Sequence, residues 1–168
     1  MLKPISPEIM EGKLQEAAGA EFPLLTWGVG YKGPSTYAVW AATLVAGILG
    51  AAIGWFTYHS LLYVGVAVGL AAGVHLLLRS RVKFTLIGVS PRYFIAIDLA
   101  RGGKFLPPAL QGLSAIQYPR VIEKELSNIL HYNLGDGSIQ DVRFQNLPHL
   151  PDNRNAAYRL RRAVLDNV

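Results

Sequence analysis

The four histidines are the side chains in this chain best suited to metal binding or proton transfer. They are His59, His75, His131 and His149, and they are widely separated along the sequence. Metal-binding helices usually place two histidines within one turn of each other, and no such pair occurs here. Cysteine is absent, which removes thiolate ligands, disulfides and thiol nucleophiles. We therefore expect no metal site.

Enzyme motifs that use glycine or serine are incomplete. Gly28, Gly30 and Gly33 precede an apolar segment rather than following a strand of a βαβ unit, so they do not predict a nucleotide-binding loop. Residues 112–116 (GLSAI) lack the second glycine of a nucleophile elbow. Asp136 and Asp141 flank a predicted turn, where aspartate is common for backbone reasons. We expect a non-enzymatic protein with no catalytic residue and no cofactor.

A long uncharged block separates two ordinarily charged parts of the chain. No Asp, Glu, Lys or Arg occurs between Lys32 and Arg79, although charged residues make up 16% of all 168. The block contains two apolar runs, residues 35–58 and 60–78, and each is long enough to cross a hydrocarbon core about 30 Å thick as a helix. The polar residues 57–60 between them predict a short turn near His59. The sequence therefore predicts a two-helix transmembrane hairpin.

Basic residues flank this block on both sides. Lys32 precedes it, and Arg79, Arg81 and Lys83 follow it, whereas the turn carries no Lys or Arg. By the positive-inside rule, we expect these four side chains to contact lipid headgroups and both termini to lie in the cytoplasm. They also account for much of the net charge of +5, so we expect membrane lipids, and not nucleic acid, as the partner.

Small residues recur at four-residue spacing in both runs. The first carries Ala42, Ala46, Gly50 and Gly54, and the second carries Gly65, Gly69 and Gly73. Small residues at this spacing allow close helix packing in membranes. Two interpretations stay open: the two faces meet inside the hairpin, or one face docks onto a helix of another protein. His75, near the end of the second run, is expected to be an interfacial polar anchor or, alternatively, part of a proton or ligand pathway.

The flanking parts predict a short helix and a small β domain. Ser6-Pro7-Glu8 is typical of a helix start and predicts a helix over about residues 7–18. Strands are predicted over 82–89, 93–98, 113–118, 128–134 and 139–144, the last two joined by an Asp-Gly turn. A terminal amphipathic helix, capped by Asp152 or Asn153, carries Arg154, Arg159, Arg161 and Arg162. The chain thus divides into an arm (1–34), the hairpin (35–79) and a cytoplasmic domain (80–168).

The order of these segments resembles that of a known family. An apolar hairpin and a basic stop are followed by VKFTLIGVSPRYFIAIDLARGG (82–103), LSAIQYPR (113–120) and LHYNLGDGSIQDVRFQNLP (130–148), and then by a terminal helix. This pattern, together with the Trp27-containing stretch before the hairpin, is similar to small bacterial membrane proteins with a bacterial pleckstrin-homology-like domain. The resemblance spans roughly residues 25–166 and implies a small antiparallel β-barrel capped by a C-terminal helix, which acts as a binding or assembly module.

The predicted function is that of a non-catalytic accessory or assembly subunit of an inner-membrane complex, with other integral membrane subunits as partners. A second hypothesis is an anionic-lipid sensor that uses Arg79, Arg81, Lys83, Arg92 and the arginines of the terminal helix. A third is a small subunit of a secretion or conjugation apparatus. The usual lack of a C-terminal barrel in such subunits argues against it.

Overall fold

The chain forms two compact units in a computed structural model that describes residues 5–34, 36–58, 62–100 and 103–168. One unit combines Met1–Lys32 with Lys83–Val168, and the other is Gly33–Val82. The first unit is a sheet domain and the second is a pair of apolar helices. In sequence, the helical unit is an insertion between the first two strands of the sheet.

The sheet domain contains one antiparallel sheet of seven strands in the order β4-β3-β2-β1-β7-β6-β5. The strands are β1 (Thr26–Lys32), β2 (Lys83–Val89), β3 (Tyr93–Leu99), β4 (Ala109–Gly112), β5 (Gln117–Glu123), β6 (Asn128–Asn133) and β7 (Ile139–Phe144). β1 pairs with β2 along its whole length, from Thr26 opposite Val89 to Lys32 opposite Lys83. Its pairing with β7 is much shorter and covers only Gly30 and Tyr31.

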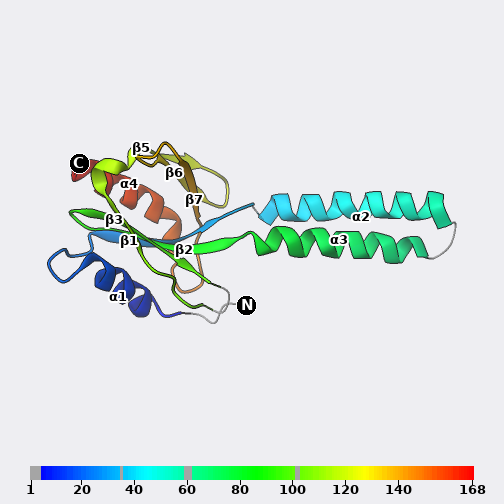
Figure 1. The fold of residues 1–168 in the computed structure, drawn as a ribbon, viewed down its shortest axis with the longest axis horizontal. Helices are drawn as coiled ribbons and strands as arrows, with labels where there is room; N and C mark the ends of the chain where they lie inside the picture. The colour runs from blue at the N-terminus through cyan, green and yellow to red at the C-terminus, as the bar shows by residue number, and fades with distance from the viewer. Residues whose placement is uncertain (1–4, 35, 59–61, 101–102) are drawn as a thin grey trace. The chain divides into compact units, whose positions relative to one another are not determined.

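Two helices cover opposite faces of the sheet (Figure 1). α1 (Pro7–Ala18) begins at the Ser6 N-cap with Pro7 at its first position, as predicted, and it packs on β2 and β3. α4 (Ala156–Asp166) packs on the other face. The two apolar cores follow from this arrangement: one under α1 includes Leu14, Leu86 and Ile95, and the other under α4 includes Ile87, Phe144 and Leu160.

The N-terminal segment is part of this domain and not a separate arm. The predicted arm ended at residue 34 and contained no strand, whereas β1 lies at the centre of the sheet. Its two glycines weaken the strand pattern, and both are required by packing. A Cβ on Gly28 would lie 2.4 Å from Ala156 Cβ, and one on Gly30 would lie 2.2 Å from Val142 Cγ1. The alternation of Trp27, Val29 and Tyr31 was the available signal.

Most of the other predicted strands are confirmed, with local corrections. β6 and β7 form the predicted hairpin, and Gly137 in its turn has a φ of 81°. The strand predicted over 113–118 is wrong in its first half, because Leu113–Ala115 form a 3-10 turn and β5 runs on to Glu123. The short strand β4 was not predicted. The helix α4 has Asn155 as its N-cap, without a side-chain cap bond, instead of Asp152 or Asn153.

The helical unit consists of α2 (Thr36–Tyr58) and α3 (Leu62–Ser80). Gly47 lies near Ala71, and Gly50 lies near Ala67. Because the partner number falls as the residue number rises, the two helices are antiparallel. The predicted turn residue His59 lies outside the described residues.

Candidate binding surfaces of the sheet domain and the helical unit

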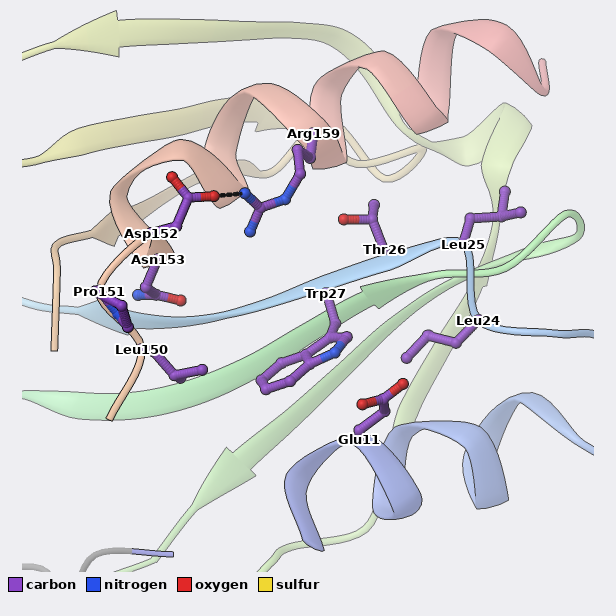
Figure 2. Close-up of a pocket in the computed structure, with 10 residues that line it drawn as sticks. All are labelled: Glu11, Leu24, Leu25, Thr26, Trp27, Leu150, Pro151, Asp152, Asn153 and Arg159. Atoms are coloured by element: carbon purple, nitrogen blue, oxygen red, sulfur yellow. Dashed lines mark hydrogen bonds and ion pairs between the residues drawn. The ribbon is translucent and has the colours of Figure 1, made fainter. Parts of the chain in front are cut away.

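A cleft of about 460 Å³ lies between α1, the start of β1 and the segment that leads into α4 (Figure 2). Glu11 contributes from α1, Thr26 and Trp27 from β1, and Arg159 from α4. The remaining lining residues are Leu24, Leu25, Leu150, Pro151, Asp152 and Asn153. The cleft thus has one indole ring, several aliphatic side chains and three ionisable groups. Its volume falls within the usual range for ligand sites.

Asn153 fixes one wall of this cleft. Its side-chain oxygen accepts a hydrogen bond from the Val29 amide (2.9 Å), and its side-chain nitrogen donates to the carbonyls of Val29 (2.7 Å) and Gln145 (2.9 Å). The residue is buried. The side-chain amide of Asn153 therefore bonds β1 at Val29, next to Gly30, where the pairing with β7 ends. Both hydrogens of its NH2 group are used. Sequence reasoning assigned Asn153 to a cap and missed this role, since its partner Val29 is 124 positions away.

The charges of the cleft are unevenly paired. Arg159 forms an ion pair with Asp152, and Asn155 donates to the same carboxyl group. These hydrogen bonds, first that of Asn155 and then that of Arg159, hold the pKa of Asp152 below its usual range. Glu11 is exposed, and within the described part of the chain no hydrogen bond or ion pair engages its carboxylate. The cleft therefore carries one uncompensated negative charge.

A second, more apolar groove of about 370 Å³ lies on the same side of the sheet as α1. Its walls are aliphatic and aromatic, and His149 is the single ionisable side chain among them. They comprise Ile5, Met10, Val29, Phe84, Leu86, Leu99, Leu147, Pro148 and Leu150 together with His149. Such a lining offers little polar chemistry to orient a reacting substrate.

His131 on β6 lies between Asp141 on β7 and Arg120 on β5. Its Nδ1 lies 2.7 Å from Asp141 Oδ1, and its Nε2 lies 3.3 Å from an Arg120 nitrogen. Both ring nitrogens therefore face charged neighbours instead of a nucleophile. Among the described residues, no group of three or more His, Asp or Glu side chains is placed to hold a metal ion.

The helical unit exposes most of its large apolar side chains. Trp40, Leu44, Ile48 and Phe56 on α2 are between 61% and 79% exposed, and Val68 and Leu76 on α3 are similar. Residues Ala38–Phe56 are long and apolar enough to cross a membrane by length and composition, and α3 carries a shorter apolar stretch, Val64–Ser80. In the described chain, this exposure distinguishes α2 from the buried core helix of a soluble protein.

The predicted small-residue faces of the two helices differ in what they contact. Gly50 and Gly54 are buried, and a Cβ on Gly50 would come within 2.8 Å of Ala67 Cα. The α2 face, with the half-buried Ala42 and Ala46, therefore packs on α3.

Gly65, Gly69 and Gly73 are exposed on α3, and a Cβ added to any of them would have no described atom within 4 Å. The interpretation that both small faces meet inside the hairpin is therefore wrong for α3. Ala67 and Ala71, which lie two residues out of phase with the glycines, take this role.

His75 forms a polar contact between the two helices. Its Nδ1 lies 3.3 Å from Thr43 Oγ1, and the Trp40 ring centroid lies 5.0 Å from its own. Thr43 donates its single hydroxyl proton to the Val39 carbonyl at 2.7 Å. The contact with His75 therefore requires the imidazole to donate from Nδ1. This geometry is that of a helix-to-helix polar pair.

The predicted headgroup contacts divide between the two units. Lys32 and Lys83 are register partners at the end of the β1–β2 ladder, while Arg79 and Arg81 are exposed in the helical unit. The arginines of the terminal-helix region bond to other groups of the sheet domain. Arg154 donates to Asn128 and to the Lys124 carbonyl, Arg161 donates to the Pro119 carbonyl, and Arg159 and Arg162 pair with Asp152 and Asp166.

No protein family, curated protein or solved structure matches this chain.

Proposed function

We propose that this chain is a membrane-anchored, non-catalytic assembly subunit of a bacterial inner-membrane complex. In this proposal α2 and α3 span the membrane as a hairpin, and the sheet domain lies in the cytoplasm with both termini. The exposed apolar surface of the helical unit carries the proposal, because water would penalise that surface by roughly 25 cal/mol per Å². The charges support the same orientation, since Lys32, Arg79, Arg81 and Lys83 all flank the apolar block at its two ends in the sequence.

The sheet domain is proposed to be a barrel of the bacterial pleckstrin-homology-like type, closed by α4. The strand order and the burial of α4 residues against strands from both halves of the order support this assignment. The domain would serve as a binding module, and the two clefts described above support that role.

The glycines of α3 are the proposed docking face for another membrane helix. A glycine inside a helix costs about 1 kcal/mol relative to alanine, and Gly65, Gly69 and Gly73 gain no close contact with the described part of the hairpin in return. Their open backbone is what a second helix requires for close approach. The Ala67 and Ala71 side of α3, by contrast, already packs on α2.

Purification of the full chain from membranes in mild detergent tests this function. We expect a stoichiometric integral membrane partner to co-purify with the wild type and to be lost with Gly69→Leu. The matched control is Ala52→Leu, which enlarges another exposed small residue, on α2, and should keep the partner. A wild-type chain that elutes alone, or a partner retained by both variants, contradicts docking through α3.

The lipid-sensing alternative loses part of its support. The arginines of the α4 region have partners inside the domain, and Arg92 lies over the Phe22 and Tyr93 rings. The basic residues that flank the apolar block are the ones left to contact anionic headgroups.

A further inference from the structure

The cleft of Figure 2 is lined by Thr26 and Trp27, at the end of β1 with which β7 does not pair. β7 pairs with β1 only at Gly30 and Tyr31, and the side chain of Asn153 bonds both backbone groups of Val29 on that edge. Backbone groups alternate between the two edges of a strand. Trp27 therefore directs its amide and carbonyl to the same edge as Val29. Within the described chain no strand pairs with Trp27 there, and Trp27 lines the cleft.

An extended polypeptide can use this open edge. Strand addition gains affinity from main-chain hydrogen bonds and specificity from the side chains that alternate along the added segment. Asp152 and Arg159 also line this cleft, and their charges compensate each other. A segment paired with Trp27 would place every second side chain on the sheet face that carries the Trp27 side chain and α1.

Glu11 and the Trp27 indole on the α1 face determine which side chain of the added segment would bind there. Figure 2 shows the Glu11 carboxylate rising from α1 on the side of the cleft that carries the Trp27 indole. An indole face attracts cations, and a free carboxylate forms charge-assisted bonds with guanidinium or ammonium groups. Since Arg159 is already neutralised, Glu11 supplies the net charge of the cleft. A basic side chain satisfies both the carboxylate and the ring.

We propose that this cleft binds an extended segment of a partner polypeptide by strand pairing at Trp27, with a basic side chain held by Glu11 and the indole. The inference rests on the proposed function only for the source of that segment, a subunit of the same complex. The pairing groups and the charge belong to the sheet domain alone.

Fluorescence of Trp27 provides the test. The chain has three tryptophans, so Trp40→Phe and Trp55→Phe in the full-length protein leave Trp27 as the reporter. The detergent-solubilised protein is titrated with a blocked valine-arginine-valine peptide, and we expect a saturable change in emission. The corresponding glutamine peptide should bind about tenfold more weakly, the equivalent of about 1.4 kcal/mol for a charged contact. Methylation of the peptide amides should abolish binding by removing the strand-pairing donors.

Two variants assign the effect to the cleft. Glu11→Gln should reduce the arginine peptide to the affinity of the glutamine peptide, whereas Glu21→Gln, at an exposed glutamate that does not line the cleft, should leave the preference intact. Equal binding of the two peptides, or full binding of the methylated peptide, overturns the proposal. If ethanolamine competes as well as the arginine peptide, the cleft binds any small cation and does not recognise a peptide. That result also overturns the proposal.

Failure of the membrane function would be visible separately. The Glu11→Gln chain should remain in the membrane fraction and keep its helix-docked partner, because Glu11 is outside the helical unit. Conversely, a chain that leaves the membrane on alkaline extraction refutes the proposed function without affecting the peptide titration.

Discussion

The sheet domain and the helical unit use the same apolar residue types in opposite ways. Leu86, Ile87 and Val89 in β2 are completely buried, whereas Leu44 and Ile48 in α2 are 68% and 61% exposed. The sheet domain buries its apolar side chains between two helices and a sheet. The helical unit buries only a narrow seam and leaves the rest outward. The difference shows that the same hydrophobicity specifies a core in one region and an outward-facing apolar surface in the other, which suits lipid as the solvent.

The glycines show the same contrast. Gly28 and Gly30 are surrounded so closely that a Cβ would collide with Ala156 or Val142, whereas Gly65, Gly69 and Gly73 face open space. In β1 a glycine is required by contacts within the domain. In α3 the glycines have no such contact among the described residues, and this contrast is the reason for proposing that they dock onto an external partner.

The largest expected effect comes from placing a charge on an exposed apolar residue in each of the two regions. Ile48→Lys places a charge in the middle of α2 and should cost membrane integration about 3 kcal/mol, the value for a lysine at a helix centre. The matched control is Ile139→Lys, since Ile139 in the sheet domain is 63% exposed and Ile48 is 61%. Alkaline extraction of membranes measures the outcome. Equal behaviour of the two variants would contradict a lipid-facing α2.

The glycine contrast is tested next. Gly30→Ala forces a Cβ to within 2.2 Å of Val142 Cγ1, and overpacking should destabilise the sheet domain by about 2 kcal/mol and lower its Tm by roughly 8 °C. Gly69→Ala, which meets nothing within 4 Å, should leave Tm unchanged or raise it slightly. Thermal unfolding followed by circular dichroism in detergent measures both. A loss of stability in Gly69→Ala would mean that α3 packs on that face.

Two threonines refine the comparison at a smaller scale. Thr85 in β2 is fully buried, and its hydroxyl has no hydrogen-bond partner among the described residues, so Thr85→Val should stabilise the domain by about 1 kcal/mol. Thr43 in α2 donates to the Val39 carbonyl and contacts His75. Thr43→Val should therefore give no gain. Thermal unfolding measures both variants, and a destabilised Thr85→Val chain would reveal a partner for that hydroxyl.

The smallest expected effect is a pH dependence of the stability of the sheet domain. Because its folded pKa is lowered by Asn155 and Arg159, Asp152 should stabilise the fold above its unfolded pKa of about 4 and lose this contribution as the pH falls through the lower folded value. Asp152→Asn should therefore lower Tm at pH 6 and approach the wild type near pH 3. The helical unit cannot supply this dependence, since residues 33–82 contain no carboxylate side chain. An unchanged difference between pH 6 and pH 3 would refute it.

Local sequence patterns predicted the elements better than the site. Ser6 and Pro7 marked the start of α1, and the Asp-Gly turn marked the β6–β7 hairpin, because both depend on neighbouring residues. β1 was not predicted, because its glycines interrupt the strand pattern. Gly28 and Gly30 are required by contacts with Ala156 and Val142, which lie far along the chain. The cleft was missed for the same reason: Glu11, Trp27 and Arg159 come from three separate segments.

Composition and short-range periodicity are enough to establish an uncharged apolar block between two basic boundaries, a strand-rich C-terminal part and the absence of cysteine chemistry. Each of these properties is carried by residues that are close together in the chain. Only the folded chain reveals that residues 26–32 complete the sheet, that Asn153 bonds the edge of β1, and that a Cβ on Gly69 would meet no described atom within 4 Å. These features depend on which distant surfaces meet, and contacts between distant surfaces leave no periodic trace in one sequence.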